Sequence, residues 1–134
     1  MANPERLIVG ISGASGVILG VRLLQALAET PIEAHLVMTK TAEVTLAYET
    51  EIKPEAVRKL ADKVYPVADL GAAISSGSFQ TRGMIIAPCS VRTLSEIATG
   101  VTSNLLTRAA DVVLKERRRL VLGLRETPLH TGHL

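Results

Sequence analysis

Residues 7–16 read LIVGISGASG, and this stretch indicates how the chain begins to fold. Its first half is a short run of apolar, mostly β-branched residues, which is typical of a strand buried on both faces of a parallel sheet. Small residues follow from Gly13 to Gly16, and apolar residues then recur at helical spacing from Val17 to about Glu29. The order strand, glycine loop, helix predicts the first unit of an α/β fold.

The remainder of the chain repeats this alternation. Further strands are expected at 35–38, 84–87 and 120–122, and helices at 41–48, 54–63, 93–98 and after Asn104. The stretch 69–83 is rich in glycine and serine and is expected to be a loop. Since 134 residues suffice for one core, we expect residues 1–134 to form a single domain with helices on both faces of a parallel sheet.

The composition argues against several classes of partner. Aromatic residues make up 2% of the chain and the formal net charge is only +2, so nucleic acid is not an expected partner. Cys89 is the only cysteine, which excludes an internal disulfide, and His35, His130 and His133 show no metal-ligand spacing. With neither a signal-peptide stretch nor an apolar run of about eighteen residues, we expect a cytoplasmic protein that does not bind a membrane or a metal.

The loop from Gly10 to Gly16 is a candidate phosphate site. It lies between a strand and a helix, where backbone N–H groups and the helix N-terminus can hold an anion. Its spacing is not that of a dinucleotide fingerprint or a P-loop, which disfavours NAD and ATP. A tight turn without a ligand explains the loop equally well.

A second motif, MIIAPCSVRT at 84–93, ends another expected strand with hydroxyl groups and amides. In a parallel sheet this end lies at the same edge as the glycine loop, so the two loops are positioned to share one ligand. Cys89 invites a nucleophile interpretation, but no histidine lies in the motif. We therefore interpret Cys89 as a small core residue.

Charged residues supply further candidates. Arg108 and Lys115 share one stripe of a helix, which is typical of a solvated face. Arg125 and Glu126 come directly after an expected strand, at the edge where ligands bind, and an arginine there suits a phosphate. Glu49 is a candidate for acid–base chemistry, although its spacing is also that of an ordinary carboxylate at a helix end.

Taken together, these motifs resemble one family. The segments that carry the resemblance are GISGASG at 10–16, LVMTK at 36–40, YET at 48–50, APCSVRTLSEIATG at 87–100, NLLTRAADVVLKERRRLVL at 104–122 and RETPL at 125–129. In this order and combination they resemble the UbiX-type flavin prenyltransferases, which include the phenolic-acid decarboxylase B subunits. Each segment is a weak signal, but the combination is specific.

The resemblance implies a three-layer αβα fold of flavodoxin-like or Rossmann-like type, and assembly as a homododecamer. It implies an enzyme that joins a dimethylallyl group from dimethylallyl phosphate to N5 and C6 of reduced FMN, without a metal. The product would be the prenylated FMN used by a partner decarboxylase of UbiD type.

The same resemblance implies the site residues. FMN contacts are expected from Gly13, Ala14, Ser15, Thr39, Ser90, Val91, Arg92, Thr93 and Arg125. The catalytic set implied is Ser15, Glu49, Lys115 and Glu126. Ser15 and Glu49 would flank the reacting flavin edge. Lys115, Arg125 and Glu126 would serve the dimethylallyl phosphate, with Arg108 as a further candidate.

Two features depart from the family pattern. Thr39 stands where serine is expected, which keeps the hydroxyl group. The sequence stops at Leu134, whereas relatives continue with a strand, a helix, and a tyrosine and a basic residue of the dimethylallyl-phosphate site. Two alternatives therefore stay open: a non-catalytic FMN-binding or assembly subunit, and a flavin-dependent cysteine decarboxylase. The latter carries an active-site histidine and a PASANT-like segment, where residues 88–93 here read PCSVRT.

Overall fold

The computed structural model describes residues 5–125 and contains a parallel sheet of five strands in the order β3-β2-β1-β4-β5. The strands are β1 (Arg6–Ile11), β2 (Glu33–Met38), β3 (Lys63–Tyr65), β4 (Gly83–Cys89) and β5 (Arg119–Leu124). Every neighbouring pair is parallel, as predicted. The first strand therefore lies at the centre of the sheet.

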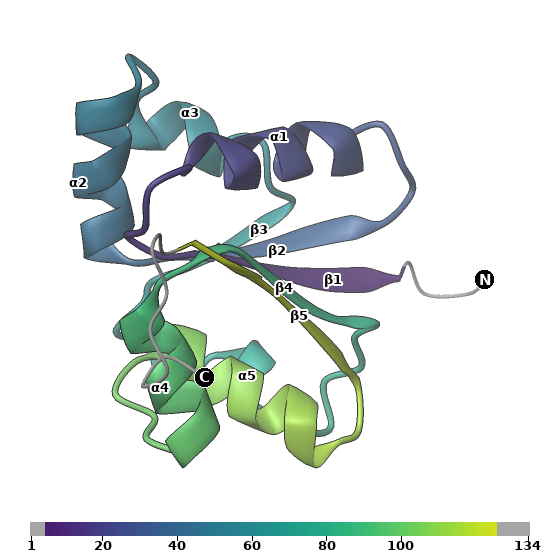
Figure 1. Ribbon diagram of the computed structural model, residues 1–134. Helices are drawn as coiled ribbons and strands as arrows, with labels where there is room; N and C mark the ends of the chain where they lie inside the picture. The colour runs from purple at the N-terminus through teal and green to yellow at the C-terminus, as the bar shows by residue number, and fades with distance from the viewer. Residues whose placement is uncertain (1–4, 126–134) are drawn as a thin grey trace.

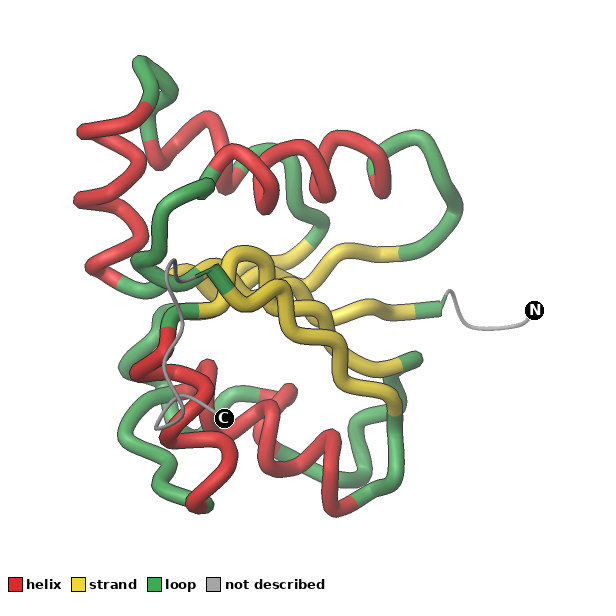
Figure 2. The backbone as a smooth tube through the Cα atoms, viewed as in Figure 1, coloured by secondary structure: helices red, strands yellow, loops and turns green. Residues whose placement is uncertain are grey.

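Helices cover both faces of the sheet. They are α1 (Ile18–Leu27), α2 (Lys40–Glu49), α3 (Pro54–Arg58), α4 (Val91–Thr99) and α5 (Leu105–Lys115), with a short 3-10 turn, η1, at Ala73–Ser75. Figure 1 shows α1, α2 and α3 above the sheet and α4 and α5 below it, and Figure 2 shows the same layers as red helices around yellow strands. The three-layer αβα prediction is confirmed. No helix within residues 5–125 is long and apolar enough to cross a membrane.

The central strand supplies apolar side chains to both layers. Ile8 belongs to the core cluster beneath the sheet with Leu106 of α5, whereas Val9 and Ile11 belong to the cluster above it with α1. Each of these strand residues is at most 1% exposed. Alternate side chains of a strand point to opposite faces, so a strand covered on both sides must be apolar throughout.

One strand was missed by the sequence prediction. A helix was expected over 54–63, but α3 ends at Arg58 and β3 begins at Lys63. Asp62 explains the change, because its N–H donates to the Ala34 carbonyl (3.0 Å) and its carboxylate accepts from the Ala34 N–H (2.8 Å). These bonds attach the chain to β2, where three residues complete an edge strand too short to show an apolar pattern.

Other boundaries differ by one or two residues from those predicted. The helix expected at 93–98 begins at Val91 because Ser90 caps it. It ends at Gly100, as predicted, where a φ of 76° favours glycine. Asn104 caps α5, also as predicted, in a reciprocal pair with Thr107.

Gly20 allows α1 to approach the sheet closely. A Cβ atom at this position would lie 2.5 Å from the Ala87 carbonyl oxygen and 2.7 Å from the Ile11 side chain. The carbonyl belongs to the backbone of β4 and cannot rotate away. The helix that follows the glycine loop is therefore seated directly over β1 and β4.

We predict that Gly20→Ala destabilises the fold. Overpacking against a fixed backbone atom costs about 1–3 kcal/mol, which exceeds the gain of up to about 1 kcal/mol in helix propensity. Urea unfolding followed by circular dichroism measures the difference. Gly71→Ala is the matched control, because a Cβ there meets only a flexible Asp69 oxygen at 3.8 Å. A Gly20→Ala chain as stable as the wild type would contradict this packing.

Candidate functional site

The site predicted from the two loops lies at the carboxyl edge of the sheet. Ser12 follows β1, Thr39 follows β2 and Ser90 follows β4, and the three residues line one hollow of about 230 Å³. The other residues that line it are Lys40, Thr41, Val67, Arg92, Thr93, Glu96 and Asn104. The glycine-loop strand and the PCSVRT segment thus meet at one place, as expected.

The side chain of Ser12 joins the ends of β1 and β4. It is 1% exposed; its hydroxyl donates to the Pro88 carbonyl (2.8 Å) and accepts from the Ser90 N–H (2.8 Å). The Ser12 N–H donates to the same carbonyl at 3.2 Å. Sequence reasoning did not select Ser12, although it lies inside the glycine motif. Its role is to hold the segment that begins α4.

We predict that Ser12→Ala lowers both stability and the affinity for any ligand of this hollow. The Ser90 N–H loses its partner in a part-buried position, at a cost of about 1–3 kcal/mol. Urea unfolding measures the first effect. Ser95→Ala, on the exposed face of α4, is the control and should change stability by no more than about 0.5 kcal/mol. Equal stability of the two variants would argue against a structural role for the Ser12 hydroxyl.

Two helices begin at the hollow with similar caps. The Thr39 hydroxyl accepts from the Ala42 N–H (3.0 Å) at the start of α2, and the Ser90 hydroxyl accepts from the Thr93 N–H (3.2 Å) at the start of α4. The amides of the first turn have no intrahelical partner, and the helix dipole places positive potential there. Two helix N-termini directed at one hollow make it suited to an anion such as a phosphate.

The glycine loop packs against the start of α2. A Cβ at Gly13 would lie 2.6 Å from the Thr41 side chain and 3.0 Å from its carbonyl carbon, so a larger residue would force the loop outward. The Thr45 hydroxyl donates to the Gly13 carbonyl (3.2 Å). Ala14 is buried and Ser15 is exposed. The loop is therefore fixed while it presents the Ser15 side chain to solvent.

Glu49 lies beside this loop although it is distant in sequence. Its Oε1 accepts hydrogen bonds from the N–H groups of Gly16 (3.0 Å) and Val17 (3.3 Å), at the N-terminus of α1. Val17, the N-cap residue, supplies no side-chain cap of its own. The carboxylate thus connects α2 with α1, and it binds the amide of Gly16, the residue directly after Ser15.

Cys89 is a core residue in the structure. Its side chain is buried among Ile86, Leu105 and other members of the lower core cluster. Burial raises the pKa of the thiol to about 11, so it stays protonated at neutral pH. This agrees with the interpretation of Cys89 as a small core residue.

The remaining predicted FMN contacts lie around the same edge. Val91 and Arg92 form the first turn of α4, and Thr93 is buried. The Arg125 N–H donates to the Cys89 carbonyl (3.1 Å), which places the residue after β5 next to the end of β4. Glu126, predicted to act on the dimethylallyl phosphate, lies outside the described residues.

Lys115 is not brought to this edge. It is the last residue of α5, which runs from the hollow at Asn104 to the opposite edge of the sheet, where β5 begins at Arg119 (Figure 1). Its ammonium group pairs with Asp111 at 3.1 Å. Arg108 is exposed in the first turns of the same helix. Within one copy of the chain, Lys115 and the glycine loop are therefore at opposite edges.

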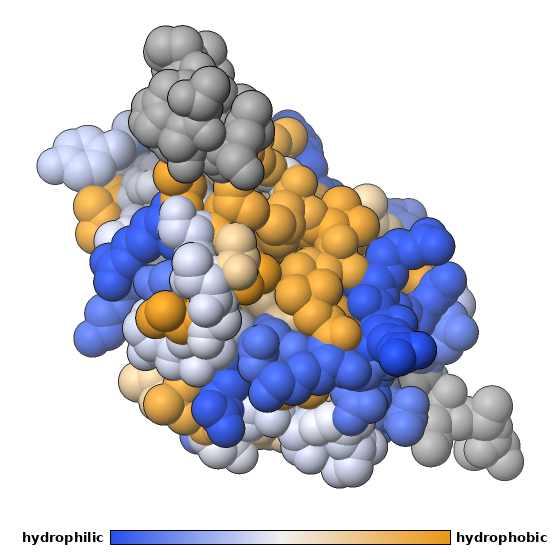
Figure 3. Space-filling model, turned by 60° about the horizontal axis from the view of Figure 1, so that its bottom comes forward, coloured by the Kyte–Doolittle hydropathy of each residue, from blue (hydrophilic) through white to orange (hydrophobic). Residues whose placement is uncertain are grey.

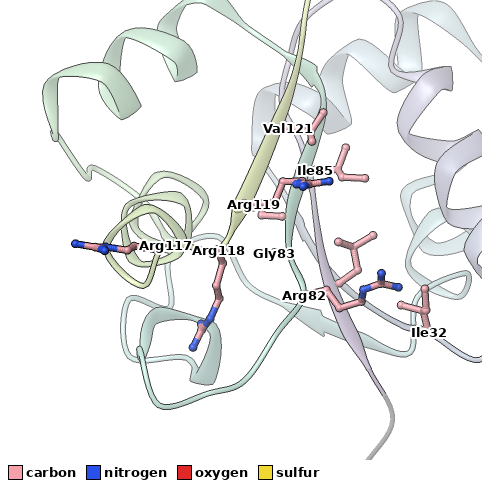
Figure 4. Close-up of a pocket in the computed structure, with 10 residues that line it drawn as sticks. Ile32, Arg82, Gly83, Ile85, Arg117, Arg118, Arg119 and Val121 are labelled. Carbon is pink, nitrogen blue, oxygen red and sulfur yellow. The ribbon is translucent and has the colours of Figure 1, made fainter.

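A larger hollow, of about 670 Å³, lies at that opposite edge and contains several arginines (Figure 4). The side chains do not converge, because Figure 4 shows Arg117 and Arg118 pointing away from Val121 and Ile85. Arg118 donates to the carbonyls of Gly77 (2.7 Å) and Phe79 (3.1 Å). Ligands of open α/β sheets bind at the carboxyl ends of strands, so the smaller hollow is the better candidate site.

No metal centre can be assembled from the residues described. Within residues 5–125, no three His, Cys, Asp or Glu side chains are grouped so that they could hold an ion. The polar residues that line the hollow carry hydroxyl groups, two cations, Lys40 and Arg92, one carboxylate, Glu96, and the side-chain amide of Asn104. The hydroxyl groups and the two cations suit a phosphate.

Fold and site together define an αβα protein with a candidate anion site, which loops form at the carboxyl edge of its sheet. Comparison with known proteins narrows this class. The family described as Flavoprotein matches residues 1–129. The flavin prenyltransferase UbiX of Escherichia coli K12 is 63% identical over 131 residues, which are 97% of this chain and 69% of that protein. The UbiX of Thauera aromatica is 57% identical and is matched over 66% of its length.

Solved structures agree with this assignment. AnUbiX, solved with FMN and dimethylallyl pyrophosphate, superposes with a TM-score of 0.96 at 50% identity, over 98% of this chain and 70% of that one. A dodecameric FMN-dependent UbiX-like decarboxylase of Escherichia coli O157:H7 gives 0.95 at 55% identity, over 96% and 70% of the two chains. The chain belongs to the Flavoprotein family, among the relatives of UbiX-type flavin prenyltransferases.

The comparison with a solved cysteine decarboxylase shows only that the two proteins share a fold. The peptidyl-cysteine decarboxylase EpiD superposes with a TM-score of 0.69 at 16% identity, over 92% of this chain and 72% of that one. Such a likeness shows the architecture alone.

Proposed function

We propose that this chain binds FMN at the hollow between the glycine loop and α4, and that it acts as a flavin prenyltransferase. The reaction joins a dimethylallyl group from dimethylallyl phosphate to N5 and C6 of reduced FMN. The observation that carries the proposal is the meeting of two helix N-termini beside the Ser12 bridge, in a chain 63% identical to a UbiX enzyme. The prenylated FMN would pass to a decarboxylase of UbiD type.

Some of the proposed FMN contacts line the hollow and others are its neighbours along the chain. Thr39, Ser90, Arg92 and Thr93 line it. Residues 13–15 follow Ser12, which also lines it, and the Arg125 N–H donates to the carbonyl of Cys89, the residue before Ser90. The first-turn amides of α2 and α4 and the cations at their starts supply the attraction for the FMN phosphate. Residues 1–134 would act as one FMN-binding domain, and the cytoplasmic location stays a prediction.

The chemistry assigns separate tasks to the charged groups. Breaking the carbon–oxygen bond of dimethylallyl phosphate develops positive charge on the allyl group and negative charge on the departing phosphate. Arg125 and Lys115 would hold that phosphate and Glu126 would protonate it. Glu49 would accept the proton released when the second bond closes the new ring. The loop amides hold Oε1 of Glu49, and no hydrogen bond of its Oε2 is found within residues 5–125.

We propose that Lys115 acts in the site of a second copy of the chain. Because Lys115 and the glycine loop lie at opposite edges of one subunit, Lys115 can serve the dimethylallyl phosphate only in a neighbour's site. Figure 3 shows apolar residues gathered on one face, and large apolar side chains such as Tyr48 (87% exposed), Leu19 (54%) and Val121 (47%) face solvent. These surfaces favour self-association. A dodecamer, as in the solved relative, is the assembly we propose.

We predict that Glu49→Gln leaves FMN affinity nearly intact but slows prenyl transfer by about 10²–10⁴-fold, as expected for loss of a proton acceptor. Lys115→Ala should raise KM for dimethylallyl phosphate and also lower kcat. The assay incubates the protein with reduced FMN and dimethylallyl phosphate and measures the prenylated flavin by mass. Lys59→Ala, on the exposed end of α3, is the control and should keep the wild-type rate.

Mixing the two impaired variants tests whether Glu49 of one subunit and Lys115 of another belong to one site. When subunits of Glu49→Gln and Lys115→Ala exchange, some interfaces combine an intact glycine-loop edge with an intact Lys115, and activity should return in part. Wild-type rates in both variants would refute the roles assigned to these residues. Mixing without recovery would refute the shared site. FMN binding without any prenylated product from the wild type would instead indicate a non-catalytic FMN-binding subunit.

A further inference from the structure

Glu96 lies at the rim of the proposed FMN hollow, one helical turn after Arg92. Its side chain is 14% exposed. Oε2 accepts from the Arg92 Nε–H (3.3 Å), and Oε1 accepts from the hydroxyl (2.6 Å) and the N–H (3.4 Å) of Ser103. One carboxylate therefore connects the cation at the start of α4 with the segment that leads into α5.

The contact with Arg92 uses only part of the guanidinium group. The bond is made at Nε, and the terminal nitrogens of Arg92 take part in no hydrogen bond or ion pair found within residues 5–125. Those terminal nitrogens form the planar pair of donors that matches a phosphate. An arginine side chain that is 82% exposed would otherwise lose considerable rotamer freedom on binding a ligand. Because Glu96 already restricts the Arg92 side chain, less conformational entropy is lost when a ligand binds.

The contact with Ser103 fixes the carboxylate itself. Hydrogen bonds from Ser103, and then the bond and charge of Arg92, hold the pKa of Glu96 below its usual value. Glu96 is therefore ionised at neutral pH and able to orient the guanidinium. Ser103 directly precedes Asn104, which caps α5 and also lines the hollow. The Glu96 carboxylate thus stabilises the rim of the hollow between α4 and α5.

We propose that Glu96 is a positioning residue, which orients the terminal nitrogens of Arg92 toward the anionic part of the flavin nucleotide. This inference rests on the proposed FMN site and adds a residue that the predicted set lacks. A carboxylate near an anion also weakens binding, since its charge repels the phosphate. The two effects have opposite signs in a binding measurement.

A double-mutant cycle on FMN affinity measures the proposed coupling. Arg92→Ala should weaken binding about tenfold in the wild type, as for a charge-assisted hydrogen bond, but about twofold or less in the Glu96→Gln background. Glu96→Gln alone should weaken binding about fivefold. Fluorescence titration of FMN gives all four dissociation constants. Additive effects, or tighter binding by Glu96→Gln, would overturn the proposal.

The matched control is Glu55→Gln, which breaks an Arg–Glu pair of α3 with Arg58 at 2.9 Å and lies outside the hollow. It should change neither FMN affinity nor the effect of Arg92→Ala. Ser103→Ala removes the hydroxyl that holds the Glu96 carboxylate but keeps the Arg92–Glu96 pair. It therefore separates the attachment of Glu96 to the segment before α5 from the orientation of Arg92. It should weaken the coupling only in part.

A second readout does not require FMN. The Nε–H resonance of Arg92 in ¹⁵N NMR should be sharp and slow to exchange in the wild type, and broadened in Glu96→Gln. An equally mobile Arg92 in both chains would overturn the positioning role, whether or not FMN binds. Failure of the folded wild type to bind FMN would overturn the proposed function, and the NMR result would still decide whether Glu96 holds Arg92.

Discussion

The hydrogen bonds of the Ser12 hydroxyl are the constraint on which the site depends. They hold the end of β1 against the turn after β4, so the glycine loop and the start of α4 meet at one edge. Ser12 is 1% exposed and the Ser90 N–H is part-buried, so loss of these bonds would leave polar groups that water replaces poorly. Gly13 and Gly20 have the complementary role, since their lack of a Cβ allows α2 and α1 to approach the same edge. The close approach of these backbone segments forms the hollow that we propose as the anion site.

Much of this arrangement was predictable from the sequence, because it follows from local patterns. The apolar run of β1, the helix stop at Gly100 and the helix start at Asn104 each depend on neighbouring residues. The strand β3 was not predictable in this way. Its formation depends on Asp62 binding the backbone of Ala34, a contact across 28 residues. A strand of three residues at the edge of a sheet has too few buried positions to show a period.

The candidate site also combines features that the sequence predicts with features that it does not. Loops that follow strands were expected at one edge because parallel sheets place them there. The contacts of Glu49 with Gly16 and of Glu96 with Ser103 were not expected, since nothing in the spacing of a carboxylate on a helix specifies its partner. Lys115 shows the limit of transferring residues from a family pattern. The pattern names the residue, but it does not specify where one copy of the chain places that residue relative to the glycine loop.

The central claim is that helix N-termini at the carboxyl edge hold the phosphate of FMN. The most direct test compares the affinities of the wild-type chain for FMN and for riboflavin, which has the same ring system and ribityl chain but no phosphate. If the first turns of α2 and α4 bind the phosphate through charge-assisted hydrogen bonds, riboflavin should bind about 100-fold more weakly. Equal dissociation constants for the two flavins would show that the phosphate is not held, and would contradict the account.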